Sequence, residues 1–422
     1  MNNQFCVYKH KFTMDDGQLV SYSLIAVRRE NGTLRFTDYH RYCRSSTNRL
    51  QKLTQDGNNR AKYVVKFLNY IFPKYQLSCL DEITSDMVID FLNAYSMCTL
   101  PNDSEMTRRS KETVGKCNSV IFDFCTLLFR DRGSACNFVV DDLYKTENRR
   151  DKRGKVVKVK VSKFKRNYKG TQRTTLRDMP NSVFGVILNH IAQHHTDLLA
   201  LVILSAFAGL RPSEACNVRR EDSPLGHGLS FQITNGKVES IKIDLANELN
   251  LRSDHVMVGG IKKERMQQVP DVFLNVFLRY YNIYMEYMNG RKYEKEYGPL
   301  SVNRQGKAIT YASYLGRFHK IIKDEITPIL LESNEGELVT YGRILLEHII
   351  SPHVFRHWYT VQLVLSGADD VATLMYWRGD KSPESALTYL QNKGEIMRQY
   401  QKVNNGLFDY MMWASAKEHN QN

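Results

Sequence analysis

Four short segments in the second half of the chain concentrate side chains that could act on a phosphate group. They are residues 208–215 (AGLRPSEA), 259–270 (GGIKKERMQQVP), 351–359 (SPHVFRHWY) and 376–389 (YWRGDKSPESALTY). Arginine, lysine and histidine bind anions through charged hydrogen bonds, and a tyrosine hydroxyl becomes a nucleophile once its proton is shared. The residue types therefore suit chemistry on a phosphate, provided that the fold brings the segments together.

The first two segments have the composition of connections between elements. Gly209 is suited to end one helix and Pro212 to begin the next, which leaves Arg211 at an elbow where its guanidinium can point into a cleft. On its own, Arg211 is better explained as a cap on a helix C-terminus. The second segment is typical of a β-hairpin turn carrying Lys262 and Lys263, a pattern that an ordinary charged surface turn shares.

The last two segments are expected to begin helices. Pro352 opens one helix, so His353 and Arg356, three residues apart, share a face near its N-terminus. That end carries a partial positive charge and free N–H groups, which suit a phosphate. Pro383 begins another helix and places Tyr389 two turns into it. Taken alone, these residues also suit an exposed polar helix start and one more core tyrosine among 24.

The order and spacing of the four segments closely resemble the catalytic domain of the tyrosine recombinase (phage integrase) family. Lys262 lies eight residues before Pro270, and Tyr389 lies 33 residues after Arg356. The resemblance covers about residues 176–395. The helical region upstream and the basic stretch after it resemble the core-binding domain and the interdomain linker of the same family.

The resemblance implies a role for each residue. Arg211 and Arg356 would clamp the non-bridging oxygens of the scissile phosphate, His353 would hydrogen-bond that phosphate and support proton transfer, and Tyr389 would be the nucleophile. The chemistry agrees, because attack on a phosphodiester builds negative charge on the equatorial oxygens. Guanidinium groups stay charged and bind such oxygens bidentately.

Lys262 would protonate the leaving 5′ oxygen, and we prefer it to Lys263 because its distance to Pro270 matches the family spacing. The phosphotyrosine ester would conserve the bond energy, so rejoining by a 5′ hydroxyl would need no ATP. The sequence has no P-loop pattern and no evident pair of acidic metal ligands. We therefore expect no cofactor and no metal ion.

Asp380 departs from the family pattern. The family usually has His or Trp nine residues before the nucleophile, and here that position is Asp380. An acid beside a scissile phosphate is repulsive unless it turns away or is neutralised. We expect it either to bridge to a cation such as Arg356 or Lys381 or to leave the packing role to Trp377, so its catalytic role stays open.

The charge of the chain favours a polyanionic partner. Its 422 residues carry 59 Lys and Arg against 45 Asp and Glu, a formal net charge of +14. Residues 149–173 hold twelve Lys or Arg and one acid, Asp151. This stretch is expected to be a solvated linker that also follows a DNA backbone. Its candidate DNA-binding residues are Lys152, Arg153, Lys155, Lys158, Lys160, Lys163, Lys165, Arg166, Lys169 and Arg173.

The expected fold is mainly α with a small antiparallel β-sheet, an α+β arrangement forming a two-lobed DNA clamp. Residues 1–45 would form an N-terminal arm segment with a small hairpin over 20–27 and 34–37. Residues 46–145 would form a helical core-binding domain, 146–175 the basic linker, 176–400 the catalytic domain and 401–422 a C-terminal tail helix packing in cis or on a neighbouring subunit. Strands are expected at 229–233, 240–245, 255–258 and 266–269.

Cysteine and apolar patterns point to an intracellular protein. The eight Cys form no C-x-x-C pair and no zinc-finger spacing, so buried free thiols are expected. No signal peptide is visible, and the longest mostly apolar run, 198–210, is too short to span a membrane. The expected location is the cytoplasm, with nucleoid association in a bacterial host.

The predicted function is site-specific DNA recombination through a covalent 3′-phosphotyrosine intermediate, as in an integrase of a mobile element. Strand exchange would need a tetramer on two specific DNA sites, with accessory DNA-bending or directionality proteins as further partners. Two alternatives remain: a type IB topoisomerase or telomere-resolving enzyme, and a DNA-binding protein with a decayed active site. A bound but uncut substrate would favour the last.

Overall fold

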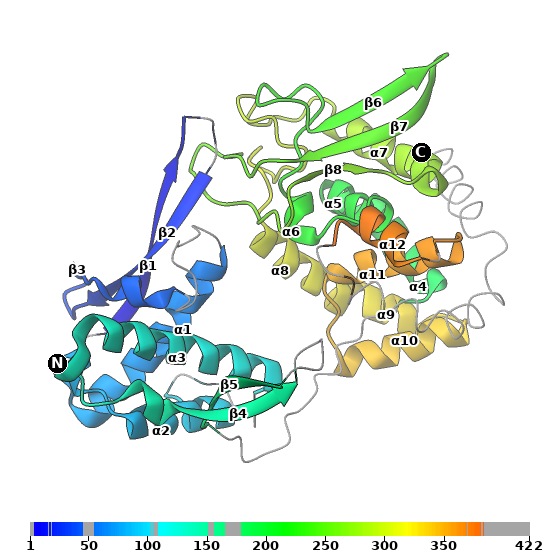
Figure 1. The fold of residues 1–422 in the computed structure, drawn as a ribbon. Helices are drawn as coiled ribbons and strands as arrows, with labels where there is room; N and C mark the ends of the chain where they lie inside the picture. The colour runs from blue at the N-terminus through cyan, green and yellow to red at the C-terminus, as the bar shows by residue number, and fades with distance from the viewer. Residues whose placement is uncertain are drawn as a thin grey trace. The chain divides into compact units, whose positions relative to one another are not determined.

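The chain divides into two compact units, one of residues 1–12 and 20–174 and the other of residues 13–19 and 175–422. The computed structural model describes residues 4–15, 17, 19–44, 55–101, 103, 109–150, 156–164, 179–368, 370–380 and 383 (Figure 1). Antiparallel strand pairs and many helices make both units up, which confirms the expected fold class of mainly α structure with small antiparallel sheets.

The first unit combines a three-stranded sheet, three long helices and a two-stranded hairpin. Its elements are β1 (Gln4–Thr13), β2 (Leu19–Arg28), β3 (Leu34–Phe36), η1 (Tyr39–Cys43), α1 (Gln55–Tyr75), η2 (Leu80–Glu82), α2 (Ser85–Met97), α3 (Lys111–Arg132), η3 (Gly133–Ala135), η4 (Val140–Leu143), β4 (Tyr144–Arg150) and β5 (Val156–Ser162).

Aromatic packing holds the three helices of this unit together. Phe67 of α1 contacts Phe91 of α2 with ring centroids 5.2 Å apart and Phe124 of α3 with centroids 6.2 Å apart, and all three side chains are fully buried. Thr84 caps α2 and Ser110 caps α3, each accepting a hydrogen bond from a backbone amide of the first turn. Burial of this apolar face is the main stabilisation of such helices.

The first 45 residues contribute to the same core. Phe5, Ile25 and Tyr42 are buried in the cluster that contains the helices. The side chain of Asn69 also exchanges two hydrogen bonds with the backbone of Phe5, at 2.8 and 2.9 Å. The expected hairpin is present as β2 and β3, whereas β1 was not expected. Most of this segment therefore packs with the helices in one compact unit, while residues 13–19 group with the second unit, and its role as an N-terminal arm stays a prediction.

Within the expected linker of residues 146–175, residues 146–150 and 156–162 form strands. β4 and β5 pair along their whole length, from Tyr144 opposite Ser162 to Arg150 opposite Val156. Valine and lysine alternate in β5, and that period of two is the pattern of a strand. The excess of charge concealed this alternation in the sequence. Residues 165–178 lie outside the described part of the chain.

The second unit is mostly helical and contains one three-stranded antiparallel sheet of order β6-β7-β8. Its elements are α4 (Asn181–His194), α5 (Thr196–Phe207), α6 (Pro212–Ala215), β6 (Leu229–Thr234), β7 (Lys237–Leu245), β8 (Arg265–Gln268), α7 (Asp271–Met288), α8 (Tyr311–Ile321), η5 (Ile322–Ile326, a π-helical turn), α9 (Thr327–Leu331), α10 (Gly336–Glu347), α11 (His353–Leu365) and α12 (Val371–Arg378).

Helix α5 is the centre of this unit. Every residue from Leu198 to Phe207 is buried, and the helix contacts α4, α6, α7 and α11 (Figure 1). Trp358 of α11 stacks on Phe184 of α4 with ring centroids 3.8 Å apart. A helix that is apolar on all sides must be surrounded in this way, and it therefore fixes the ends of α5 and α11 that carry candidate site residues.

Three of the four strands expected in this unit are present in the sheet, and the fourth is not. β6 pairs with β7, and β7 with β8. The strand expected at 255–258 is absent: His255 has φ of +52°, which no extended strand adopts. Lys262 and Lys263 consequently lie in a long connection, residues 246–264, and not in a tight hairpin turn.

All eight cysteines are free; burial was expected for all, but four are buried (Cys43, Cys117, Cys125 and Cys216) and four are partly exposed. Among the described helices, none has both the length and the apolar composition required to cross a bilayer.

Candidate active site

Arg211 lies at the expected elbow between α5 and α6. Gly209, in the left-handed region at φ +66°, turns the chain, and a Cβ there would stand 2.3 Å from the ring of Tyr359. Only glycine fits both conditions. Pro212 then begins α6, and the Arg211 amide donates to the Glu214 carboxylate at 3.1 Å. The elbow thus fixes the backbone of Arg211 from both sides.

Arg356 lies in the first turn of α11 and is almost completely buried. Its guanidinium donates to the carbonyl oxygen of Gly209 and, at 2.7 Å, to that of Arg378. These two bonds join the start of α11 to the elbow after α5 and to the end of α12. His353 lies one turn earlier on the same face; part of its side chain is open to solvent, although protein atoms surround it closely enough to desolvate the ring.

Asp380 is the point at which three arginines meet. Its Oδ1 atom accepts from Nη2 of Arg211 and from Nη2 of Arg356, both at 2.8 Å, and its Oδ2 accepts from Nε of Arg378 at 2.6 Å. Gly379, left-handed at φ +59°, ends α12 and turns the carboxylate toward the arginines. The expected bridge from Asp380 to Arg356 is therefore present; Lys381 lies outside the described residues.

Glu214 is a second, fully buried carboxylate that the sequence analysis missed. It accepts from Arg211 at 2.9 Å and from Arg265 at 3.0 Å, and its Oε1 also receives the backbone amide of Lys262 at 3.3 Å. Its spacing of three residues after Arg211 was the only available signal, since that spacing places both side chains on one turn. Arg265 and Arg378, both nearly buried, had no comparable signal.

The two candidate lysines differ in what they contact. The side chain of Lys262 is exposed, and its backbone is held by Glu214. The ammonium of Lys263 donates to the carbonyl oxygen of Asp380 at 3.3 Å. The sequence resemblance favoured Lys262, whereas the contacts of the structure bring Lys263 to the arginine cluster.

The cluster shifts the pKa values of its members. Burial, together with the charges of Arg211 and Arg378, lowers the pKa of Arg356 to about 9. Desolvation, Arg356 and Arg211 lower the pKa of His353 to about 4, so that its ring is neutral at pH 7. Burial acts to raise the pKa of Asp380, but Arg378, Arg356 and Arg211 together hold it below its usual value.

Positive charge exceeds negative charge in this cluster. The four guanidinium groups of Arg211, Arg265, Arg356 and Arg378 meet the two carboxylates of Glu214 and Asp380, a surplus of two positive charges (4 − 2). A preorganised group of cations in a partly desolvated place binds an anion more strongly than the same cations in water. The arrangement can therefore hold an additional anionic group beside Arg211, whose side chain remains 14% exposed.

Several predicted site residues lie outside the described part of the chain. These include the predicted nucleophile Tyr389, the tail 401–422 and the linker residues Lys152, Arg153, Lys155, Lys165, Arg166, Lys169 and Arg173. Of the remaining linker residues, Lys158 and Lys163 are exposed, and Lys160 lies on β5 opposite Thr146.

No protein-family model matches this chain, and no curated protein sequence matches it significantly. Solved structures with similarity include the XerH site-specific recombinase bound to its difH substrate, 16% identical, covering 79% of this chain and 76% of that one, with a TM-score of 0.45. The Tn1549 transposon integrase in complex with transposon right end DNA is 15% identical, covering 86% and 98%, with a TM-score of 0.46. A lambda integrase dimer bound to a COC′ core site is 10% identical, covering 91% and 95%, with a TM-score of 0.43.

Proposed function

We propose that this chain is a tyrosine recombinase: a site-specific enzyme that cuts and rejoins DNA through a covalent 3′-phosphotyrosine intermediate. One observation carries the proposal. Arg211 and Arg356, far apart in the sequence, each direct an Nη2 atom at the same carboxylate oxygen at 2.8 Å. Two guanidinium groups converging on one anionic oxygen can serve as the fixed cations that stabilise negative charge during phosphoryl transfer.

In this proposal the scissile phosphate takes the place of the Asp380 carboxylate on the two arginines. Arg211 and Arg356 donate to its non-bridging oxygens and stabilise the charge that develops during attack. Asp380 holds both guanidinium groups in place before DNA binds and keeps its bond to Arg378 afterwards. Glu214, itself held by Arg265, keeps Arg211 at the elbow.

The proposed proton transfers assign a role to each ionisable group that the sequence resemblance singled out. Tyr389 attacks phosphorus and forms the phosphotyrosine ester, and its phenolic proton is taken up as the bond forms. His353, neutral at pH 7, can hydrogen-bond the phosphate or accept that proton. Lys262 protonates the leaving 5′ oxygen; the contact of Lys263 with Asp380 makes Lys263 the second candidate for this role.

Double-stranded DNA with specific recombination sites is the proposed substrate, and the net charge of +14 supports a polyanion. The basic hairpin and the residues after it would follow the phosphate backbone. Exchange of strands between two sites requires a tetramer, and accessory DNA-bending or directionality proteins would set its direction. The proposed role is the integration of a mobile element, in the cytoplasm or on the nucleoid of a bacterial host.

A plasmid assay separates recombination from simple relaxation. A supercoiled plasmid carrying two copies of the DNA that flanks the gene of this chain is incubated with the purified protein. The proposal predicts deletion or inversion of the segment between the sites, and no reaction on a plasmid with one site changed in sequence. Relaxation of both plasmids without rearrangement would instead indicate a topoisomerase.

A further inference from the structure

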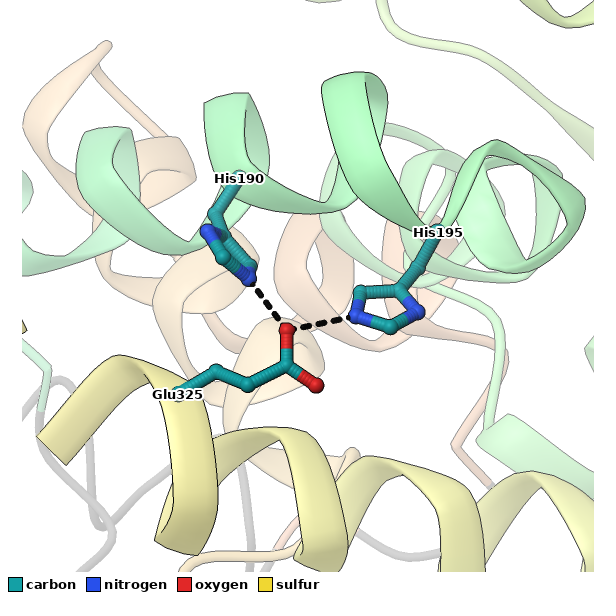
Figure 2. Close-up of side chains that lie close together, drawn as sticks. All are labelled: His190, His195 and Glu325. Atoms are coloured by element: carbon teal, nitrogen blue, oxygen red, sulfur yellow. Dashed lines mark hydrogen bonds and ion pairs between the residues drawn. The ribbon is translucent and has the colours of Figure 1, made fainter.

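Two histidines and a glutamate converge in the second unit, outside the arginine cluster. Figure 2 shows His190 on α4 and His195 at the junction of α4 and α5, both directed at Glu325 on the π-helical turn η5. The Nε2 atoms of both rings lie 2.7 Å from the same oxygen of Glu325, Oε2. The ligand atoms of all three side chains lie within 4.8 Å of one another.

The π-helical turn is the local feature that aims Glu325. The helical segment from Tyr311 to Leu331 contains Pro328, which has no amide hydrogen and whose ring conflicts with the carbonyl of the residue four earlier. The chain widens to an i→i+5 bond, from the Thr327 amide to the Ile322 carbonyl, directly before that proline. The Thr327 hydroxyl also donates to Ile322 at 2.7 Å. Such widened turns occur often at functional sites.

We propose that His190, His195 and Glu325 form a binding site for a divalent transition metal ion, with Zn²⁺ as the best-suited ion. Two imidazole nitrogens and one carboxylate oxygen are a ligand set that Zn²⁺ takes in tetrahedral sites with water in the fourth position. The three side chains are 13%, 21% and 35% exposed, so an ion can enter and a water molecule can complete the coordination.

Coordination needs only a small movement and a balanced transfer of protons. With metal–ligand bonds of about 2.0–2.2 Å, tetrahedral ligand atoms lie roughly 3.4 Å apart, so the N–O contacts at 2.7 Å must open slightly. Each ring coordinates through the Nε2 lone pair, and a proton now on Nε2 moves to Nδ1 or to solvent. Glu325 binds as a carboxylate.

The bound ion would connect segments more than one hundred residues apart in the sequence, since it joins the α4–α5 junction to the turn before α9. That junction leads directly into the buried helix α5, which ends at the Arg211 elbow. Binding to the folded chain alone stabilises it by mass action. The ion would therefore act as a structural clip on the helix that carries the arginine site.

The test measures Zn²⁺ binding by the full chain after chelator treatment, using calorimetric titration and thermal unfolding. We expect the wild type to bind one Zn²⁺ ion tightly. Its Tm should rise by roughly 5–10 °C when the free Zn²⁺ concentration is about one hundred times the Kd. His195→Gln and Glu325→Gln each remove one ligand and keep a hydrogen-bonding side chain. Each should weaken that binding at least tenfold, since even outer-shell partners contribute roughly 10–100-fold.

His227→Gln is the matched control, because His227 is an exposed histidine of the same unit that contacts the Glu221 carbonyl. The His227→Gln variant should still bind one Zn²⁺ ion with the affinity of the wild type. His194 is unsuitable, since its ring lies 4.7 Å from that of His190. Anomalous diffraction from wild-type crystals soaked in Zn²⁺ locates the ion even if a variant fails to fold. No Zn²⁺-dependent rise in Tm, an unchanged affinity in both ligand variants, or an ion bound elsewhere would overturn the proposal.

Discussion

Nη2 of Arg356 lies 2.8 Å from Oδ1 of Asp380, and both side chains are buried. The same oxygen accepts from Arg211, so an internal carboxylate occupies the donors that we propose for a DNA phosphate. DNA must therefore compete with Asp380 for the two guanidinium groups. This competition is measurable, because the charge of Asp380 can be removed while its shape is kept.

Asp380→Asn should tighten binding of DNA and weaken the fold. Removing a negative charge beside the phosphate is expected to increase the affinity about tenfold, or about 1.4 kcal/mol. Loss of the carboxylate also leaves Arg211, Arg356 and Arg378 without their shared counter-ion, so the variant should unfold at lower urea. DNA titration and urea denaturation check both effects. Weaker DNA binding by a folded variant would contradict the proposed competition.

Arg211→Lys should reduce cleavage much more than binding. A lysine keeps the charge but cannot bridge Glu214 and the phosphate with a planar fork, so we expect roughly 10²–10³-fold slower cleavage. Arg220→Lys is the control, since Arg220 has a similar exposed fraction of 15% and pairs with Asp222 away from the cluster. Single-turnover cleavage and DNA titration separate the two quantities. If Arg211→Lys and Arg220→Lys slowed cleavage by the same factor, Arg211 would have no special role in cleavage.

Glu214→Gln should destabilise the second unit in a pH-dependent manner. Arg265 and Arg211 outweigh the effect of burial and lower the pKa of Glu214 to about 2, from a usual 4.5. Because the folded pKa is below the unfolded one, the stabilisation is present above pH 4.5 and disappears as the pH falls toward 2. We expect a loss of about 3 kcal/mol at pH 7. Urea unfolding at pH 7, 4 and 3 should show this difference shrinking; a constant difference would refute the pKa assignment.

Lys158→Ala should weaken DNA binding without regard to sequence. Lys158 is exposed on β5, and removal of one phosphate contact should lower the slope of log K against log salt by about one. Lys145→Ala is the matched control: the strand register places Lys145 on the other face of the hairpin, and its ammonium pairs with Glu147. A salt series on specific and random DNA provides the slopes. If both substitutions lowered the salt slope equally, the face of the β4–β5 hairpin that carries Lys158 would have no particular role in DNA binding.

Local patterns in the sequence predicted the elbow after α5 and the start of α11, where a glycine or a proline determines the backbone. Gly209 and Pro212 indicated the elbow, and Pro352 indicated the start of α11. The departure at Asp380 also pointed to its bond with Arg356. The β4–β5 hairpin was missed because charge dominated a valine alternation.

Long-range partners had no signal in the sequence. Glu214 and Arg265 meet only because the connection after β7 returns to α6, and spacing between them says nothing of that contact. His190 and Glu325 likewise are brought together by the packing of α4 against η5. Such contacts are properties of the folded core, which a single sequence does not display.

The most direct measurement is a covalent trapping assay on nicked DNA carrying the sequence that flanks the gene of this chain. Wild type, Tyr389→Phe and Tyr376→Phe are compared, since Tyr376 is an exposed tyrosine on α12 and the next candidate. We predict a denaturant-resistant adduct with wild type and Tyr376→Phe, and none with Tyr389→Phe although that variant still binds DNA. An adduct that persists in Tyr389→Phe, or its absence from all three despite specific binding, would contradict the proposed nucleophile.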